Sequence, residues 1–338
     1  MCSLEISTPA AQGISVALAD IGRWLQQQGY RFITVTPATH KIVNDRSDAP
    51  AQNLRDIFGW SQPFRTGQLD AGVFGMLDSH ELIEHLPDGL ARSRVRFSSL
   101  DAVHGKRGEA GSLYAHSAYP TLQTDSVFFG PDTWRFVALI RSVLQTRPLA
   151  AGARILDVGC GAGPGGIEAA LASVGSGPRL VLSDINARAL QFAQANASIA
   201  GLAQVDLRCG DLYEPVPGAF DLILANPPYL VDPGHRAYRD GGGALGATLS
   251  ERIVSQGVAR LTPGGRLILY TGSAIVDGKD LFYDALQPLW NSGQWQHRYW
   301  ELDPDVFGQE LQSSPYRNVD RIAAVALVVT RAVEGKAA

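Results

Sequence analysis

The sequence predicts an α/β protein in which a parallel sheet follows a smaller, mostly helical N-terminal region. Two observations predict this class. Short apolar runs alternate with helical patterns along residues 154–260, which indicates βαβ units and a parallel sheet. The runs also stop at a glycine cluster, at acids or at a proline pair. Because open α/β sheets bind ligands at the carboxyl ends of their strands, these stops predict where a functional site lies.

The N-terminal region has the pattern of a helical domain. Apolar residues recur at helical spacing in residues 14–25, as expected for one face of an amphipathic helix. Shorter amphipathic segments follow near residues 51–59, 68–77 and 79–86. These segments predict a small domain built mainly from helices.

The end of this region marks a predicted domain boundary. Val95–Leu100 fits a short strand, and residues 103–113 are polar and rich in glycine, which is typical of a linker or an exposed loop. We therefore expect an N-terminal helical domain over residues 1–115 that recognises the substrate. The domain that carries the chemistry then covers residues 116–338.

A glycine-rich loop follows the first predicted strand of the sheet. Asp157 lies at the end of that strand, Gly159, Gly161 and Gly163 come next, and a helix begins near Gly165. Glycines tolerate positive φ and let a ligand approach the backbone closely. A carboxylate beside such a loop would repel a pyrophosphate, whereas it can accept hydrogen bonds from a cationic amino group.

The same loop also contains the spacing of a dinucleotide site, Gly161-x-Gly163-x-x-Gly166, with Asp184 after the next strand. A nicotinamide-dependent oxidoreductase is therefore an alternative. It requires that Asp157 has no role in ligand binding. The run of glycines also begins earlier, at Gly159, than a dinucleotide loop would.

Two further acids stand at the ends of predicted strands. Asp184 ends the strand over residues 180–183, and Asp211 follows the strand over residues 205–210. An acid in the first position accepts hydrogen bonds from ribose hydroxyls. Asp211 can accept from an adenine amino group while Leu212 packs on the ring. The alternative for each acid alone is a solvated loop residue or a helix N-cap.

The most informative stretch is Asn226-Pro227-Pro228-Tyr229, which follows the apolar run 220–225. Two prolines stop a strand, because neither has an N–H and each fixes φ. The Asn226 side-chain oxygen and the Pro227 carbonyl can accept hydrogen bonds from a planar nitrogen group, and the Tyr229 ring can stack on it. A plain turn that ends the strand is the alternative.

Together these motifs resemble those of the class I S-adenosylmethionine-dependent methyltransferases. Within that class they look most like the HemK-like protein-glutamine N5-methyltransferases and the small-domain nucleic-acid amino-methyltransferases. The resemblance covers about residues 120–335 and rests on the stretches 157–163, 183–186, 210–213, 220–229, 240–245 and 261–267. It implies a seven-stranded Rossmann-like sheet, completed by strands near 295–302 and 322–330.

The resemblance also implies S-adenosyl-L-methionine as the cofactor and extends its site. Cys160 and Ile185 lie within the matching motifs, and Asn226 borders the cofactor. Related enzymes place a segment like Phe129 to Asp132 over the methionine end of the cofactor, although a helix cap and a core contact would explain these two residues as well.

The methyl acceptor stays open, since Asn-Pro-Pro-Tyr serves glutamine amides and nucleobase amines alike. Protein glutamine, RNA and a small molecule are the candidates. Residues 270–273 and 301–310 depart from the glutamine methyltransferases. The loop 230–247 and the insertion 303–318 are the second choice, after the N-terminal domain, for the surface that binds the acceptor. A nucleoside-binding or partner-binding module without turnover is the non-enzymatic alternative.

Composition narrows the class of partner. The net charge of −4 argues against broad binding to duplex DNA or long RNA, which depends on neutralising phosphates. No apolar run reaches the roughly 18 residues of a membrane span, and the N-terminus lacks the pattern of a signal peptide. The three cysteines and seven histidines form no ligand pattern for a metal. We expect a cytoplasmic enzyme without metal.

Overall fold

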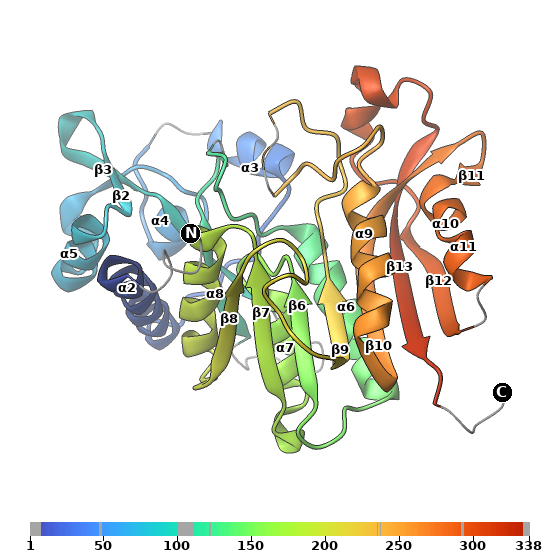
Figure 1. Ribbon diagram of the computed structural model, residues 1–338. Helices are drawn as coiled ribbons and strands as arrows, with labels where there is room; N and C mark the ends of the chain where they lie inside the picture. Colours follow the sequence, from blue (N-terminus) through green and yellow to red (C-terminus); the bar gives the residue numbers. More distant parts are fainter. Residues whose placement is uncertain are drawn as a thin grey trace. The chain divides into compact units, whose positions relative to one another are not determined.

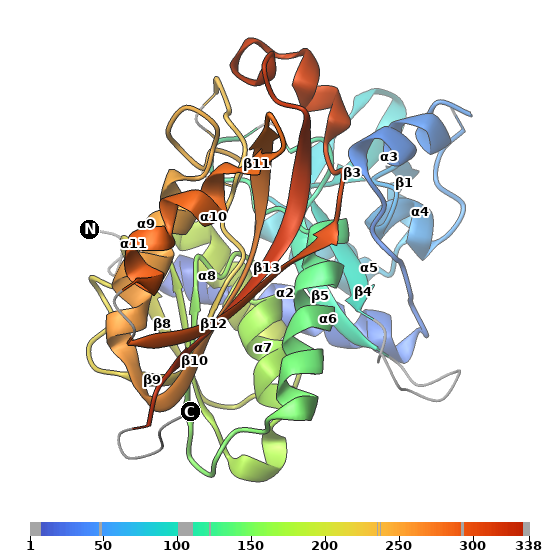
Figure 2. The ribbon, with the colours of Figure 1, turned by 90° about the vertical axis from the view of Figure 1, so that its right-hand side faces the viewer.

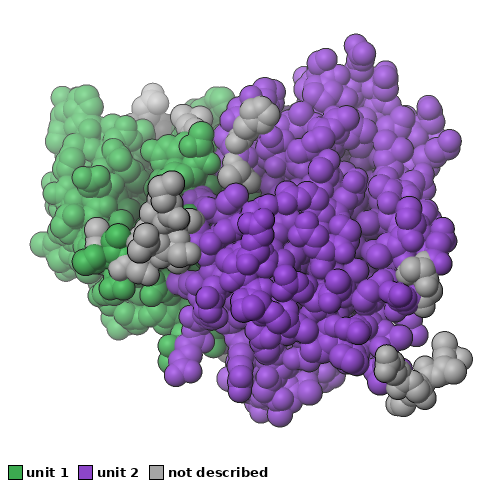
Figure 3. Space-filling model, viewed as in Figure 1, with its two compact units in different colours: residues 1–134, 161–164, 187–203 green, residues 135–160, 165–186, 204–338 purple. Residues whose placement is uncertain are grey.

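The computed structural model describes residues 8–46, 49–100, 111–121, 123–234, 236, 238–291 and 294–333. The chain forms two compact units (Figure 3), each assembled from separate stretches of sequence. Unit 1 comprises residues 1–134, 161–164 and 187–203, and unit 2 comprises residues 135–160, 165–186 and 204–338. The predicted boundary between residues 115 and 116 stays a prediction.

Unit 2 is built on one large sheet (Figure 1). Seven strands follow the order β12-β13-β10-β9-β6-β7-β8, and the two-residue strand β11 pairs with β10 as an eighth. The strands from β6 to β10 are parallel, whereas β12 and β13 are antiparallel. Their bounds are β6 (Arg154–Val158), β7 (Arg179–Asp184), β8 (Val205–Cys209), β9 (Phe220–Ala225), β10 (Leu261–Val276), β11 (Lys279–Asp280), β12 (Trp295–Asp303) and β13 (Arg321–Arg331). The α/β class and the final strand pair are confirmed.

Helices cover both faces of this sheet (Figures 1 and 2). On one face lie α9 (Thr248–Gly257), α10 (Leu281–Ala285) and α11 (Gln287–Trp290), whose apolar side chains share a buried cluster with the strands. On the other face lie α6 (Pro131–Thr146) and α7 (Pro164–Leu171). The packing of α7 is close, because a Cβ added at Gly166 would lie 2.6 Å from Leu182 Cδ2. Burial on both faces explains why the strands read as continuous apolar runs.

The register of the parallel strands aligns their carboxyl ends. Val158 of β6 pairs with Ala225 of β9 and with Ser183 of β7, and Asp184 pairs with Cys209 of β8. The residues that follow these strands therefore emerge along one edge of the sheet. This edge is where the sequence predicts the functional site.

Unit 1 combines helices with two small sheets. Its helices are α2 (Pro9–Gln27), α3 (Pro37–Asn44), α4 (Leu54–Phe58), α5 (Ala71–Ser79) and α8 (Ala187–Ile199). A three-stranded sheet joins β1 (Phe64–Arg65), β3 (Leu90–Ser93) and β2 (Ile83–His85), and β4 (Val95–Leu100) pairs with β5 (Ser112–Ser117). Within this region, strands thus accompany the predicted helices.

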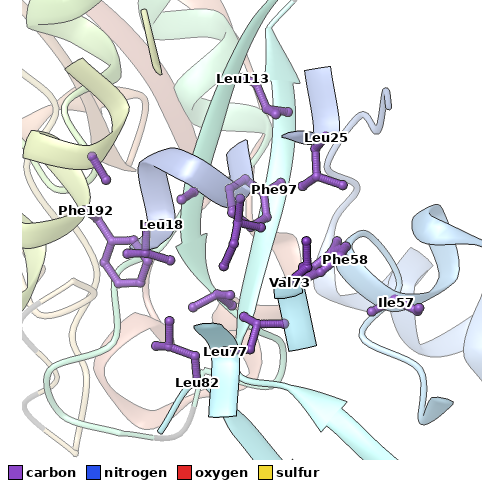
Figure 4. Packing of buried hydrophobic residues seen from close by; sticks show 14 of the residues in the cluster. Leu18, Leu25, Ile57, Phe58, Val73, Leu77, Leu82, Phe97, Leu113 and Phe192 are labelled. Carbon is purple, nitrogen blue, oxygen red and sulfur yellow. The ribbon is translucent and has the colours of Figure 1, made fainter. Parts of the chain in front are cut away.

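The core of unit 1 draws on distant parts of the chain (Figure 4). Leu18 of α2, Phe58 of α4, Phe97 of β4 and Phe192 of α8 belong to one cluster of buried side chains. The approach of α2 to α8 is very close: a Cβ added at Gly22 would lie 2.3 Å from Ile199 Cδ1. The absence of a side chain at Gly22 therefore allows this helix pair to form.

One expectation for this region is wrong, and a second is wrong at two residues. The amphipathic segment 79–86 contains no helix after Ser79; it forms β2, because Ile83–His85 pairs with β3. Residues 103–110 of the expected linker lie outside the described residues, and its last two residues, Ser112 and Leu113, begin strand β5. In both cases pairing with a neighbouring strand decides the structure, and that information is not local.

Candidate active site

The end of β6 places a buried acid beneath the glycine loop. Asp157 is 1% exposed, and its Oδ2 accepts a hydrogen bond of 2.7 Å from the backbone N–H of Gly166 in α7. Burial raises the pKa of Asp157 to about 7; the Gly166 N–H lowers it, and the charge of Asp184 raises it further. A neighbouring cation would therefore favour the ionised form of this carboxyl group.

The loop after Asp157 has room for a ligand against its backbone. Gly159 and Gly161 have φ of +64° and +55°, which glycine adopts without strain. A Cβ added at either position would meet no atom within 4 Å. The backbone N–H of Cys160 donates to the Ser183 carbonyl at 3.0 Å, so the loop is tied to the end of β7.

The end of β7 carries Asp184 and Ile185. Asp184 Oδ1 accepts a hydrogen bond of 2.8 Å from the backbone N–H of Asn186, just before α8 begins. This bond closes a turn over residues 184–186. Ile185 is 62% exposed, so its side chain is accessible to a ligand. An exposed apolar group beside a carboxylate suits a nucleoside, whose ring is apolar and whose ribose donates hydrogen bonds.

The end of β8 carries Asp211 in a contact that the sequence does not predict. Arg252 of α9 donates from its Nη2 to Asp211 Oδ2 at 2.6 Å. Both side chains are more than a third exposed, so the pair adds little to stability. Leu212 follows, buried, with φ of +47°. Pairing with Arg252 needed knowledge of where α9 lies, which no local pattern supplies.

Asn226 emerges directly from the central strand β9. Its side chain is half-buried and makes no hydrogen bond within the part of the chain that the structure describes. Pro227 is buried beside it. The open amide stands on the same sheet edge as Asp157, because Val158 and Ala225 pair across β6 and β9.

Tyr229 is packed more tightly than the sequence indicates. The side chain is 7% exposed, and its ring meets those of Tyr270 and Phe307 edge-on, with centroids 6.4 and 5.8 Å away. A Cβ added at Gly272 would lie 2.2 Å from Tyr229 Cδ2. Glycine at position 272 therefore makes space for this ring.

The insertion 303–318 holds the segment that follows Asn-Pro-Pro-Tyr. The Tyr316 hydroxyl accepts a 2.9 Å hydrogen bond from the Val231 N–H, and Arg239 pairs with Glu310 at 2.6 Å. Together with the contact of Phe307 on Tyr229, these interactions fasten the loop 230–247 to the insertion. The sequence marked the insertion as unfamiliar and as a second choice for the surface that binds the acceptor. The contacts of Phe307, Glu310 and Tyr316 had no sequence signal.

An internal ion cluster also stiffens this loop. Asp232 is 2% exposed and receives hydrogen bonds from the backbone and side chain of Arg236. Hydrogen bonding by Arg236 lowers the pKa of Asp232 to about 2. Arg239 also approaches it, at 3.5 Å. His235, which the sequence also places in this loop, lies outside the described residues.

The remaining predicted residues, Phe129, Asp132 and Gly163, belong to unit 1. Phe129 is 2% exposed and stacks on His116, with ring centroids 5.1 Å apart. Asp132 is buried in the first turn of α6. Gly163 has φ of +81°. The roles of these residues toward a cofactor remain predictions.

The described residues contain neither a cluster of metal ligands nor a helix that could span a membrane. No group of three or more His, Cys, Asp or Glu side chains there has the arrangement to hold a metal ion. No described helix is long and apolar enough to cross a membrane.

Comparison with known proteins agrees with this geometry. The profile of the family described as "Methyltransferase small domain" matches residues 137–281. A release factor glutamine methyltransferase of Cereibacter sphaeroides is 30% identical over 225 residues, which cover 59% of this chain and 74% of the relative. A ribosomal RNA small subunit methyltransferase C of Sodalis glossinidius is 40% identical over 75 residues, 22% of this chain and 21% of the relative.

Among solved structures, TrmN from Thermus thermophilus is similar with a TM-score of 0.40 and 21% identity, over 60% of this chain and 52% of that one. The long match to the glutamine methyltransferase spans most of that relative's length, which shows the family. The chain therefore belongs to the HemK-like class I S-adenosylmethionine-dependent methyltransferases, and it is an enzyme of that class.

Proposed function

We propose that the enzyme methylates a planar amide or exocyclic amino nitrogen, with S-adenosylmethionine bound along the ends of β6, β7 and β8. The observation that carries the proposal is the open Asn226 amide on the sheet edge that also holds Asp157. The open space at Gly159 and the exposed Ile185 fit a nucleoside cofactor.

In this proposal the end of each strand binds a different part of the cofactor. Asp157 accepts hydrogen bonds from its amino group, and the backbone from Gly159 through Cys160 and Gly161 to Gly163 lies against its methionine part. Asp184 accepts from the ribose hydroxyls, with Ile185 packed beside them. Asp211 and Leu212 receive the adenine. When bound, S-adenosylmethionine supplies an electrophilic methyl group.

The chain's contribution to the reaction is mainly orientation of the acceptor nitrogen. An amide or aromatic amine is a poor nucleophile, because its lone pair is delocalised. Hydrogen bonds from its N–H groups to Asn226 Oδ1 and to the Pro227 carbonyl oxygen raise the electron density on nitrogen and aim the lone pair. Tyr229, fixed by Phe307 and Tyr270, stacks against the planar group. The proton leaves to water after transfer.

Among acceptors we favour a protein glutamine. The relative that matches over most of its length is a release factor glutamine methyltransferase, whereas the ribosomal RNA methyltransferase matches over 75 residues. The net charge of −4 also gives no general attraction to RNA. Recognition of the acceptor is proposed for residues 1–115, with cofactor binding and chemistry in residues 116–338 and a cytoplasmic location.

The acceptor can be identified directly. Purified enzyme is incubated with S-adenosylmethionine labelled in its methyl group and a fractionated cell extract, and the label is followed into protein, RNA and small molecules. We expect label in protein, as N5-methylglutamine after complete enzymatic digestion. Label confined to RNA or to small molecules would move the assignment to those acceptors, and preferential binding of a nicotinamide dinucleotide would overturn the cofactor.

Two variants separate catalysis from cofactor binding. Asn226→Ala should lower turnover by about two to three orders of magnitude, as the loss of a preorganised polar group does, and leave cofactor affinity within about twofold. Asp184→Ala should weaken cofactor affinity by about 1.5–3 kcal/mol, the usual value of a charged hydrogen bond. Calorimetry and a turnover assay check both. Near wild-type turnover in Asn226→Ala would make that residue merely structural.

A further inference from the structure

Unit 1 buries a cation that has no hydrogen-bond acceptor at two of its nitrogen atoms. Arg96 lies in β4 and is 4% exposed. Its Nε and Nη2 have no hydrogen-bond partner within the described residues. Burying a charge without a partner is strongly unfavourable. A guanidinium group in this state therefore points to an anionic ligand.

A small cavity opens beside this guanidinium group. Its lining includes Arg96, His40, His116, Tyr119 and Phe129. None of its lining residues, all of them in the described part of unit 1, is acidic. Arg96 and His116 face each other across the β4–β5 hairpin, which is labelled in Figure 2. The hairpin register thus directs both side chains to the same side.

The cavity carries a single positive charge at neutral pH. Burial lowers the pKa of Arg96 only to about 10, so its guanidinium stays protonated. Burial, with the charge of Arg96 second, lowers the pKa of His40 to about 4 and that of His116 well below its ordinary value. Both imidazoles are therefore neutral, and the Arg96 guanidinium is the cation that an anion meets here.

His116 lines the cavity, and both of its ring nitrogens already have partners. Its Nε2 pairs with Ser98 Oγ at 2.7 Å, and its Nδ1 lies 3.0 Å from the Ser117 carbonyl oxygen. The ring is also stacked under Phe129. Because both ring nitrogens have partners, His116 fixes the shape of the cavity and leaves ligand binding to its neighbours.

His40 offers a second donor. It is 3% exposed, and its Nε2 has no partner within the described residues. Asn44 Nδ2 donates to Nδ1 of this ring at 3.4 Å. The orientation of the Asn44 amide is set by Gln62, which donates to its Oδ1, and by the Trp60 carbonyl, which accepts from its Nδ2. The neutral imidazole then carries its proton on Nε2, as a donor.

We propose that this cavity, the Arg96 cavity, binds a carboxylate group. The Nε–H and an Nη2–H lie side by side on one edge of a guanidinium plane, the fork that binds both oxygens of a carboxylate. The Phe32 ring, 5.3 Å from the guanidinium carbon, holds that plane in place. The proposal is independent of methyl transfer.

The test observes Arg96 in the full-length protein by NMR of arginine Nε–H groups. Formate and acetate are titrated at constant ionic strength, with sodium chloride supplying an anion that lacks the two oxygens of a carboxylate. We expect one Nε–H signal to shift saturably with formate and acetate, and at least tenfold more weakly with chloride. The signal assignment comes from its absence in Arg96→Lys.

Matched variants locate the site. Arg94→Lys alters an exposed arginine two residues away and should leave the titration unchanged. His40→Phe keeps the guanidinium and should weaken formate binding severalfold, which tests the cavity even where Arg96→Lys does not fold. N-acetylglycine, which resembles a chain terminus, distinguishes two sources of the group: tighter binding than acetate indicates a polypeptide terminus, and weaker binding indicates a free small acid.

Three results would overturn the proposal. The first is that the Arg96 signal shows no saturable shift up to about 0.1 M formate. The second is that chloride binds as tightly as formate. The third is that the formate titration is unchanged in His40→Phe but changed in Arg94→Lys. Tighter binding of inorganic phosphate than of formate would replace the carboxylate with a phosphate group. Each readout is a binding measurement, so it is unaffected if the proposed methyl acceptor is wrong.

Discussion

Asp157 combines deep burial with a position under an open glycine loop. Its raised pKa of about 7 means that the carboxyl group is half protonated near neutral pH in the free enzyme. Between the ordinary pKa of 3.8 and this value, the folded state holds a proton that the unfolded state has released. Its contribution to the free energy of unfolding therefore falls as the pH rises through that window.

Cofactor affinity should depend on pH in the opposite sense. The proposed partner of Asp157 is a cationic amino group, which favours the ionised carboxylate, so binding releases a proton. From pH 6 to 7.5 we expect affinity to rise about fivefold to tenfold; above this range the cofactor's own α-amino group begins to lose its charge. Calorimetry in buffers of different ionisation enthalpy measures the released proton.

The control for this prediction is Asp157→Asn, which keeps the size of the side chain and removes its titration. The variant should bind the cofactor more weakly and without the pH dependence. An affinity in the wild type that stays constant from pH 6 to 7.5 would show that no cation meets Asp157 in the complex.

Single residues also show what a sequence can and cannot predict at this scale. Asp157, Asp184, Asp211 and Asn226 were identified because each stands at the end of an apolar run, and the structure places all four in or just after the carboxyl ends of neighbouring strands. The partners of these residues were not predictable. Arg252 reaches Asp211 only because α9 packs where it does, and such pairings depend on the assembled fold.

At the scale of elements, the insertion 303–318 acts as a support for the loop 230–247. The partly buried ion pair between Arg239 and Glu310 joins the two segments. In Glu310→Gln we expect the loop to loosen, so that KM for the methyl acceptor rises severalfold while cofactor affinity is unchanged. A turnover assay with the identified acceptor and calorimetry with the cofactor check this.

Glu301→Gln is the matched control, since Glu301 pairs with Arg321 between the edge strands β12 and β13. It loses the same kind of interaction and should leave KM unchanged. A similar effect of both substitutions on KM would mean that general destabilisation, and not loosening of the loop, is the cause.

The helix pair α2 and α8 gives a prediction about stability. Gly22→Ala places a methyl group 2.3 Å from Ile199 Cδ1, and such overpacking costs about 1–3 kcal/mol. Gly75→Ala in α5 meets no atom within 4 Å and should stabilise the helix by about 0.5–1 kcal/mol, as alanine does in place of glycine. Urea unfolding compares the two variants. Equal free energies of unfolding would contradict the close helix contact.

Over the whole molecule, the elements that the sequence predicts correctly are those whose signal lies within a short stretch of residues. The strands β6 to β9 and the helix α7 were predicted because apolar runs, glycines and prolines occur together in sequence. The pairing of β1, β2 and β3 and the contact of Phe307 on Tyr229 were missed, since they join segments that only the fold brings together.

The intertwined sequence of unit 1 has a consequence for how the gene can be divided. Phe192 and Ile199 of α8 belong to the same core cluster as Leu18 and Leu25 of α2, although some 170 positions separate them in the sequence. A gene cut after residue 110 would leave α8 with an uncovered apolar face.

The fragment 111–338 expressed alone should aggregate, and co-expression with 1–110 should rescue it as a complex that elutes as one species in gel filtration. A soluble, monomeric fragment 111–338 with the wild-type melting temperature would show that α8 does not need α2 in order to fold. If the fragments depend on each other in this way, recombination cannot exchange the N-terminal region as a cassette, and any change of acceptor has to evolve by substitution within an unbroken chain.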